Sequence, residues 1–259
     1  MKYKTKVLVD RFAGIISQWP GVDCITLNEA AMPDTLDPYF ALILDVFYTG
    51  IIPGAEERCR LYGNDVAAFE VSNQGSKDRF LIGDIPVRLE YKSTRKTSEF
   101  VALADINQES LWLIKHSGTY GYYRLAHGEI LFCRNNWMQD IRERLFSLDD
   151  VFWQAMRETH QSKMEHLLGD LGAALLQEDS FNYLISSSLF IKTACLTLFC
   201  INRRFEPSHR GYYKQVLELP VLPESFRAEF ESFLSTEKEM TVERKYSLAQ
   251  LIARGIIAL

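Results

Sequence analysis

The sequence predicts an α+β protein, with a mixed β-sheet half and flanking helices over residues 1–145 and an all-helical half over residues 146–259. Two patterns support this prediction. In the first half, segments with helical spacing alternate with short apolar runs bounded by turn residues, which is typical of strands and helices mixed together. From Asn136 onward the apolar spacing is helical almost to the end, which is typical of a helical bundle. We therefore expect two domains.

Composition and charge set the broad class of the protein. The chain has 259 residues, of which 47% are hydrophobic and 24% charged, the usual balance of a folded globular protein. The net charge of −5 argues against nucleic-acid binding through a generally basic surface. The start of the chain is amphipathic and contains Asp10, unlike a signal-peptide core. The most apolar stretch, Ser188 to Ile201, contains Lys192 and is too short to span a bilayer. We expect a cytoplasmic protein with no membrane segment.

The cysteines indicate a reducing compartment. Their number is odd and their spacing matches no zinc site, and all but Cys59 sit among apolar neighbours; the five are Cys24, Cys59, Cys133, Cys195 and Cys200. We expect five free thiols.

The first half carries the signals of a small sheet. Apolar residues at helical spacing end at Trp19-Pro20-Gly21, which terminates the first helix. The near-continuous apolar run over 39–48 contains one acid, Asp45, and indicates a central strand buried on both faces. The elements expected here are a helix over 2–18, strands over 22–27 and 39–48, a short helix opened by Pro53, strands over 67–72 and 80–91, a helix carrying Leu111, Trp112 and Ile114, and short extended segments over 122–125 and 130–133.

The second half reads as helices separated by prolines. Ser147, followed by two aspartates, starts a long helix that reaches Gln177, and Asp179 caps the next helix, which runs to about Arg204. A last amphipathic helix starts near Glu237. These helices predict a bundle.

Several segments resemble bacterial nucleotidyltransferase-fold proteins. In the helical half, Leu171-Gly172-Ala173-Ala174-Leu175, Phe190-Ile191-Lys192 and the run from Leu198 to Pro207 resemble the C-terminal, HEPN-like helical domain of relatives of kanamycin nucleotidyltransferase and of minimal nucleotidyltransferases. In the first half, Asp37-Pro38-Tyr39 before the buried strand resembles the catalytic strand of that family.

The resemblance implies transfer of a nucleotidyl group from a nucleoside triphosphate to a hydroxyl of a small-molecule or protein acceptor. In the family, two carboxylates spaced Asp-x-Asp on one strand face hold two Mg²⁺ (or Mn²⁺) ions, and a third carboxylate lies on a neighbouring strand. The cofactors implied are therefore Mg²⁺ or Mn²⁺ and a nucleoside triphosphate. A homodimer is a further expectation for this chain.

The sequence departs from the family pattern in two places. Asn28-Glu29-Ala30-Ala31 stands where the family has a Gly-Ser pair that brings backbone amides to the phosphates. An ungapped alignment places the paired carboxylates at Ala41 and Ile43, which cannot bind a metal. A bulge that shifts the register would make Asp45 the second carboxylate.

Asp45 and Glu90 are the candidate catalytic residues and metal ligands, with Glu90 also a candidate general base. Further donors would have to come from residues such as Asp37 or Glu70. The competing structural hypotheses are pairing of Asp45 with Arg88, Lys92 or a helix N-terminus, and a solvated strand face for Glu90.

Basic residues after the Glu90 strand are the candidate nucleotide ligands. Lys92, Arg95 and Lys96 cluster there, and Lys77 and Arg79 lie on the preceding hairpin. Such cations can hold triphosphate oxygens, although a basic loop is more often merely solvated.

Three functional hypotheses follow. The first is an active nucleotidyltransferase that uses Asp45 and Glu90. The second is a catalytically inactive protein of the same fold, used for nucleotide sensing or partner binding, which the residues Ala41 and Ile43 favour. The third is a HEPN-like ribonuclease or toxin–antitoxin component, suggested by the Arg-x4-His spacing of Arg204 and His209.

Overall fold

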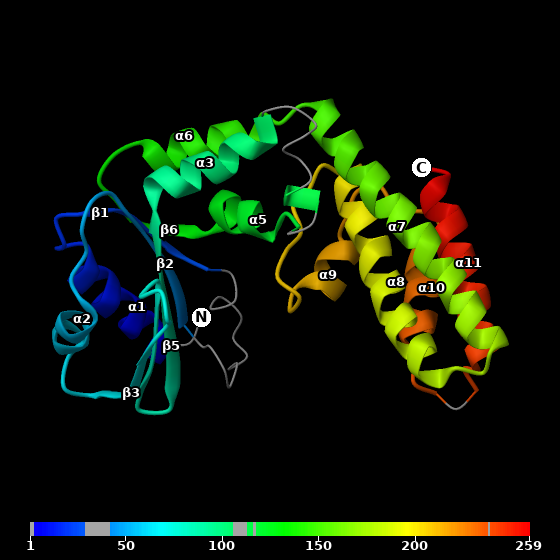
Figure 1. The fold of residues 1–259 in the computed structure, drawn as a ribbon, viewed down its shortest axis with the longest axis horizontal. Helices are drawn as coiled ribbons and strands as arrows, with labels where there is room; N and C mark the ends of the chain where they lie inside the picture. Colours follow the sequence, from blue (N-terminus) through cyan, green and yellow to red (C-terminus); the bar gives the residue numbers. More distant parts are fainter. Residues whose placement is uncertain (1–2, 29–41, 106–112, 116–117, 238) are drawn as a thin grey trace. The chain divides into compact units, whose positions relative to one another are not determined.

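The computed structural model describes residues 3–28, 42–105, 113–115, 118–237 and 239–259 (Figure 1). The chain forms two compact units, the first made of Met1–Ile106 and Tyr120–Ser147 and the second of Asn107–Thr119 and Leu148–Leu259. The division after Ser147 lies close to the predicted boundary at residue 145. The segment Asn107–Thr119, which the sequence prediction placed in the first domain, groups with the second unit.

The first unit is built on a mixed sheet. Its strands are β1 Val22–Leu27, β2 Leu42–Tyr48, β3 Val66–Val71, β4 Lys77–Ile82, β5 Ile85–Ser93 and β6 Glu129–Cys133, in the spatial order β3-β4-β5-β2-β1-β6. Strands β2 and β5 are parallel, and the other described neighbours are antiparallel. Its described helices are α1 Tyr3–Ile16, α2 Ala55–Tyr62, α3 Thr94–Asp105, α5 Tyr120–His127 and α6 Trp137–Phe146.

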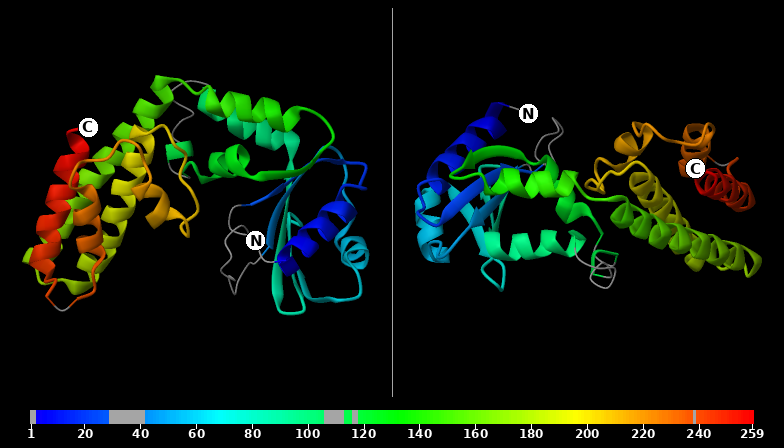
Figure 2. Two further views of the ribbon diagram at one scale, coloured as in Figure 1. Left: turned by 180° about the vertical axis from the view of Figure 1, so that it is seen from behind. Right: turned by 90° about the horizontal axis from the view of Figure 1, so that it is seen from above.

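The two faces of this sheet have different neighbours. Leu44 and Val46 of β2 join the apolar core formed with α1. Alternation along the strand turns the intervening residues to the opposite face, where Phe47 lies 5.3 Å from the ring of Trp137 on α6. Figure 2 shows α1 apart from α3 and α6, with the sheet between them. Asp45 shares the face of Phe47 and therefore points toward the side of α3, α5 and α6.

The second unit is a helical bundle, as predicted. Its described helices are α7 Asp150–Leu176, α8 Ser180–Ile201, α9 Tyr212–Leu217, α10 Phe226–Leu234 and α11 Val242–Ile257. Asp149 and Asp179 cap α7 and α8, each by accepting a hydrogen bond from the backbone amide three residues on. One face of α8 lies in the apolar core, where Phe190, Ala194 and Leu198 are fully buried. By length and composition α8 could cross a membrane, but half of its apolar window is buried inside this bundle.

Most predicted elements are present, and three segments differ from the prediction. The segment predicted as one strand over 80–91 is a hairpin, because Gly83 adopts a positive φ of 60° and reverses the chain between β4 and β5. The segment over 122–125 is part of helix α5 rather than extended, since Tyr122, Leu125 and Ala126 bury one helical face. Arg95 and Lys96 lie in the first turn of α3 rather than in a loop. Leu111 and Trp112 lie outside the described residues.

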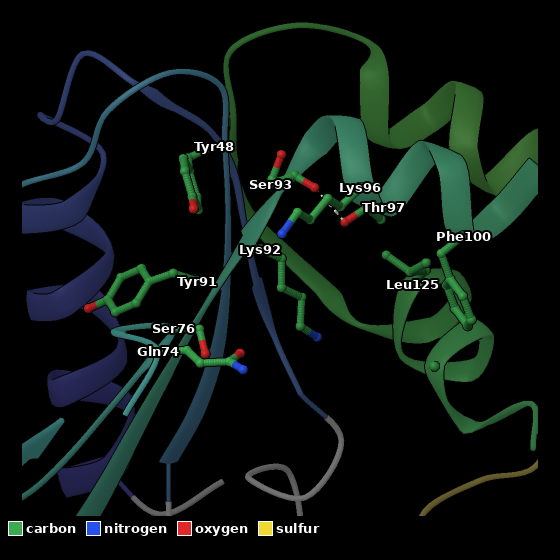
Figure 3. Close-up of a pocket in the computed structure, with 11 residues that line it drawn as sticks. Tyr48, Gln74, Ser76, Tyr91, Lys92, Ser93, Lys96, Thr97, Phe100 and Leu125 are labelled. Atoms are coloured by element: carbon green, nitrogen blue, oxygen red, sulfur yellow. Dashed lines mark hydrogen bonds between the residues drawn. The ribbon is translucent and has the colours of Figure 1, made fainter. Parts of the chain in front are cut away.

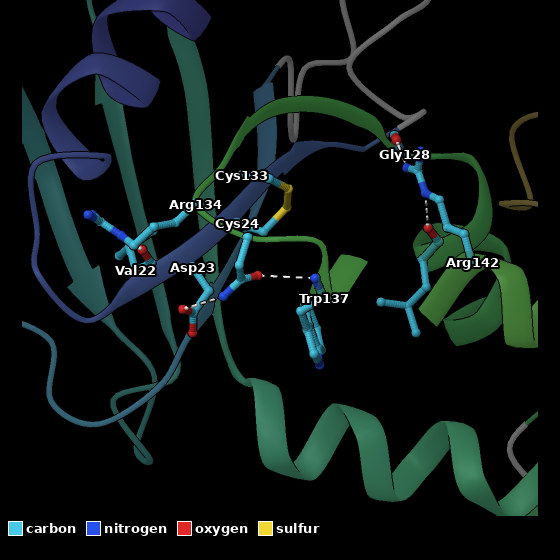
Figure 4. The surroundings of a disulfide bond; sticks show 10 residues. Val22, Asp23, Cys24, Gly128, Cys133, Arg134, Trp137 and Arg142 are labelled. Atoms are coloured by element: carbon cyan, nitrogen blue, oxygen red, sulfur yellow. Dashed lines mark hydrogen bonds between the residues drawn. A yellow bond between two sulfur atoms is a disulfide. The ribbon is translucent and has the colours of Figure 1, made fainter. Parts of the chain in front are cut away.

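The prediction of five free thiols is wrong for one pair. Cys24 of β1 and Cys133 of β6 occupy paired positions on neighbouring strands and form a disulfide (Figure 4). The two cysteines are 109 residues apart in sequence, so only the strand pairing brings them together. Cys59, Cys195 and Cys200 are free. Burial raises the pKa of Cys195 to about 12, which keeps this thiol protonated.

Candidate functional site

Asp45 and Glu90 are direct neighbours in the sheet. The parallel pairing of β2 with β5 places them at the same level, and it runs from Leu42 to Tyr48 without a shift of register. Both carboxylates are buried. The structure therefore brings the two predicted acids together on one face. It does so without the bulge that the sequence comparison invoked, because the β2–β5 register is continuous through Asp45.

A guanidinium from α5 joins the two carboxylates. The Nε of Arg124 donates to Asp45 Oδ2 at 3.0 Å, and its Nη2 contacts Asp45 Oδ1. Its Nη1 lies 3.1 Å from Glu90 Oε2. Burial alone would lower the pKa of Arg124, but Asp45 and Glu90 outweigh it and raise the pKa. Arg124 was missing from the sequence prediction, because residues 122–125 were interpreted as extended and the helix that carries it was not recognised.

Close packing fixes the position of α5. A Cβ at Gly121 would lie 2.9 Å from the ring of Phe100 on α3, so a larger residue would displace this ring. At the other end of α5, Arg142 of α6 donates to the carbonyl oxygen of Leu125 at 3.0 Å and also contacts that of Gly128 (Figure 4). A cation at this end satisfies carbonyl groups left open by the helix. These contacts hold Arg124 over the sheet.

Two further cations complete the cluster. Lys92 Nζ lies 3.0 Å from Asp45 Oδ2 and 3.6 Å from Glu90 Oε2, and Arg88 contacts Glu90 Oε1. Burial alone would raise the pKa of Glu90, but the charges of Arg124, Lys92 and Arg88 hold it below its ordinary value. Three cations surround two carboxylates, so the ionised cluster carries a net charge of +1. We call these five residues the charge cluster.

The charge cluster does not fit a divalent metal ion. Mg²⁺ requires several oxygen ligands in near-octahedral geometry, and the oxygens of Asp45 and Glu90 already contact guanidinium and ammonium groups. Across the described residues no group of three or more His, Cys, Asp or Glu could hold a metal. Glu70, a predicted extra donor, is exposed on β3 and separated from β5 by β4. Asp37 and Ala41 lie outside the described residues.

The position of the family's Gly-Ser pair is also occupied differently. The backbone amide of Asn28 donates to the carbonyl oxygen of Ile43 at 2.9 Å. This amide is therefore engaged in pairing with β2 and is not directed at a phosphate. Glu29, the next residue, lies outside the described residues.

The predicted nucleotide-binding cations separate into two groups. Lys77 of β4 is paired in register with Glu90, and Lys92 belongs to the charge cluster. Arg95 is 80% exposed, and its Nε lies 3.9 Å from Glu99 one helical turn on, so its charge faces solvent. Lys96, in the same turn of α3, lines a pocket instead.

A pocket of about 700 Å³ lies where the parallel strands β2 and β5 end and α3 begins. Figure 3 shows Lys92, Lys96, Phe100 and Leu125 among the residues that line it. Hydroxyl groups from Ser76, Ser93 and Thr97 also line it. The carboxyl ends of parallel strands, next to a helix N-terminus, are a recurrent place for ligands in α/β sheets.

Arg204 and His209, the predicted HEPN-like pair, do not share a helix. Residues 204–208 follow the end of α8 and are not helical. His209 stacks on Tyr212 with ring centroids 5.6 Å apart. Between them Glu206 is buried and accepts a hydrogen bond from the Tyr212 hydroxyl at 2.8 Å. The Arg-x4-His segment of the second unit thus contains a buried, hydrogen-bonded carboxylate, that of Glu206.

Comparisons with known proteins find similarity among solved structures. No protein-family model matches the chain, and no curated protein matches it. Among solved structures, the chain is similar to a nucleotidyltransferase-like protein from Exiguobacterium sibiricum, at 11% sequence identity and a TM-score of 0.47. The match covers 98% of this chain and 74% of that protein.

Proposed function

We propose that the first unit is a nucleotide-sensing module that binds a nucleoside phosphate in the pocket between β5 and α3 without a catalytic metal ion. The observation that carries this proposal is the bridge from Arg124 to both Asp45 and Glu90. It engages the two acids that a metal-dependent nucleotidyl transfer would need.

The strength of this bridge follows from its burial. Asp45 and Glu90 are buried, and the side chain of Arg124 is only 12% exposed. Removing one partner from a buried ion pair costs about 3–5 kcal/mol, because the other charge is left unpaired. A divalent ion would have to displace Arg124 and leave its charge beside Lys92. The guanidinium is therefore the better occupant of this position.

The pocket has the chemistry of a phosphate site. Lys96 and Lys92 supply positive charge at its wall. The first backbone amides of the twelve-residue helix α3 have no partner within the helix, and its dipole favours an anion at this end. Phe100 and Tyr48 supply aromatic surface on which a base can stack. A volume of about 700 Å³ is within the range of small-ligand sites.

Lys92 links the pocket to the charge cluster. Its ammonium group lies 3.0 Å from Asp45, and the same residue lines the pocket. A bound phosphate competes with Asp45 for this cation. Binding would then weaken the contact between Lys92 and Asp45 and change the net charge around Arg124. This change is the signal by which the unit would respond to a ligand.

The test is thermal unfolding of the full chain with each nucleoside triphosphate, with pyrophosphate and with inorganic phosphate, in excess EDTA and again in Mg²⁺. A ligand at a hundred times its dissociation constant stabilises the folded state by about 2.7 kcal/mol, which raises Tm by several degrees. We expect a nucleotide to raise Tm in EDTA.

Two matched variants locate the site. Lys96→Ala removes a pocket cation, whereas Arg95→Ala removes its exposed neighbour, which pairs with Glu99. We expect the apparent affinity derived from the Tm shift to fall at least tenfold in Lys96→Ala and to stay unchanged in Arg95→Ala.

Two results would contradict the proposal. If no nucleotide shifts Tm at millimolar concentration, the pocket is not a nucleotide site. If the shift requires Mg²⁺ and disappears in Asp45→Asn, the competing hypothesis of a metal-dependent transferase, using Asp45 and Glu90, is the better account.

A further inference from the structure

Helix α8 exposes an apolar stripe on the side opposite its buried face. The stripe consists of one side chain from the end of α7 and four from α8, and their exposed fractions are Leu176 (86%), Phe181 (73%), Leu184 (66%), Ile185 (44%) and Leu189 (41%). We call these residues the α8 stripe. The buried face of the same helix carries Phe190, Ala194 and Leu198. A helix that is apolar all round is normally covered on both sides.

The α8 stripe is large enough to mark an interaction site. Fully exposed aromatic and large aliphatic side chains present about 150–250 Å² each, so the five exposed fractions sum to an area on the order of 500 Å². Patches of this size on soluble proteins commonly mark binding surfaces. A stable dimer buries about 800 Å² per partner. The stripe supplies most of that area, and the polar residues that flank it supply the rest.

We propose that the α8 stripe is the interface of a homodimer, in which α8 of one chain packs antiparallel on α8 of a second copy about a two-fold axis near Ile185. In a two-fold interface the same patch meets itself, so it must hold no like charges at its centre. Residues 180–191 contain no charged side chain of either sign.

The charges beyond the stripe are complementary in this arrangement. Glu178 lies seven residues before Ile185 and Lys192 lies seven residues after it. Antiparallel pairing about Ile185 therefore brings Glu178 of one copy beside Lys192 of the other. Within its own chain the Nζ of Lys192 lies 3.8 Å from Glu206 Oε1, but the side chain is 41% exposed and remains accessible to a second carboxylate.

The same charges disfavour a lipid surface as the occupant. Helices that lie on membranes carry Lys and Arg around their apolar face to bind anionic headgroups. Residues 176–191 contain no Lys or Arg, and the turn holds Glu178 and Asp179. An anionic membrane would repel this end of α8, whereas a second copy offers it Lys192.

The test is the molar mass of the full chain by size-exclusion chromatography with light scattering, supported by analytical ultracentrifugation. We expect twice the mass of one chain for the native sequence. Ile185→Glu places two like charges at the two-fold axis, and we expect the dissociation constant to rise by at least about 100-fold. The matched control is Leu251→Glu on α11, which is similarly exposed (46%) but lies outside the stripe and should leave the dimer intact.

A charge-swap mixture tests the contact of residue 185 with its own copy across the two-fold axis. Ile185→Glu and Ile185→Lys each disrupt their own dimer, and mixing them in equal amounts should restore one, since residue 185 faces itself only across a two-fold axis. Circular dichroism confirms that each variant is folded. The proposal would be overturned by any of three results. The native chain could have the mass of a monomer at all concentrations, the dimer could be unaffected by Ile185→Glu, or the monomer could bind anionic vesicles through the stripe. None of these measurements depends on nucleotide binding.

Discussion

Asp45 and Glu90 lie side by side on the parallel strands β2 and β5, and one guanidinium contacts both. Two buried carboxylates on directly paired residues of neighbouring strands repel each other unless cations lie between or beside them. Arg124, Lys92 and Arg88 provide these cations. The predictions about the first unit follow from this arrangement.

Replacement of Arg124 by Ala should destabilise the first unit strongly. It leaves two buried carboxylates with fewer cations, and we expect the free energy of unfolding to fall by about 3–5 kcal/mol. Urea unfolding followed by tryptophan fluorescence measures the loss. Arg95→Ala, at an exposed position, should change it by less than about 0.5 kcal/mol. A loss below about 1 kcal/mol for Arg124→Ala would show that the bridge contributes little.

Removal of Arg124 should also create affinity for a divalent ion. Without the guanidinium, Asp45 and Glu90 present free oxygens to a cation. We expect Mn²⁺ to raise the Tm of Arg124→Ala by several degrees and to leave the native chain almost unchanged. The Tm of each protein in metal-free buffer containing EDTA is the baseline. An equal response of the native chain would mean that the metal binds elsewhere or displaces Arg124 without difficulty.

The stability of the first unit should depend on the ionisation of Glu90. Burial raises the pKa of this carboxyl, but Arg124, Lys92 and Arg88 together hold it below the ordinary value of 4.5. A carboxylate with a depressed folded pKa stabilises the fold above its unfolded pKa, and this contribution disappears as pH falls through the folded pKa. We therefore expect the difference in unfolding free energy between the native chain and Glu90→Gln to be constant near neutral pH and to shrink below about pH 4.5. A difference that is independent of pH would contradict this.

His160 should make the second unit sensitive to mild acid. Burial, with smaller contributions from Lys163 and Lys192, lowers the pKa of His160 to about 4. The unfolded chain binds a proton at this residue near pH 6.5, whereas the folded chain does so only near pH 4, so stability falls as pH decreases between these values. The shift corresponds to a loss of about 3 kcal/mol.

The measurement for His160 is unfolding free energy from pH 7.5 to 4.5 in the native chain and in His160→Gln. We expect the acid-dependent loss to be reduced in the variant. His166→Gln, on an exposed part of the same helix α7, is the matched control and should keep the native profile. Identical profiles for the native chain and His160→Gln would show that other groups cause the acid sensitivity.

Loss of the Cys24–Cys133 disulfide should weaken the first unit. The bond closes a segment of 109 residues, and removing a disulfide typically lowers the free energy of unfolding by about 2–5 kcal/mol. Cys24→Ser should show this loss, whereas Cys59→Ser, at a free thiol, should not. Peptide mapping without reductant identifies the bond directly. Recovery of Cys24 and Cys133 as free thiols under these conditions would contradict this prediction.

Local sequence patterns were sufficient for most individual elements. The apolar run of β2, the helical spacing of α1 and the aspartates that cap α7 and α8 each act over a few residues, so they are visible along the chain. The same patterns failed where neighbouring signals compete. The alternation of β4 continues into β5 and concealed the turn at Gly83, and the aromatic residues of α5 resembled a strand.

The candidate site was only half visible in the sequence. Asp45 and Glu90 were identifiable as acids within apolar or alternating strands, because an acid in such a place needs a partner. The identity of that partner was not predictable. Arg124 is 79 residues from Asp45 and lies on a helix whose position depends on its packing against Phe100 and Arg142.

The sequence by itself determined the α+β class, the division into a sheet half and a helical half, and the two acids on neighbouring strands, because these depend on side-chain periodicity and composition. Only the tertiary structure decided that Arg124 bridges Asp45 and Glu90, that Cys24 meets Cys133, and that Lys96 rather than Arg95 lines the pocket. These relationships depend on strand order and helix packing, which join residues far apart in the chain, and no local pattern records them.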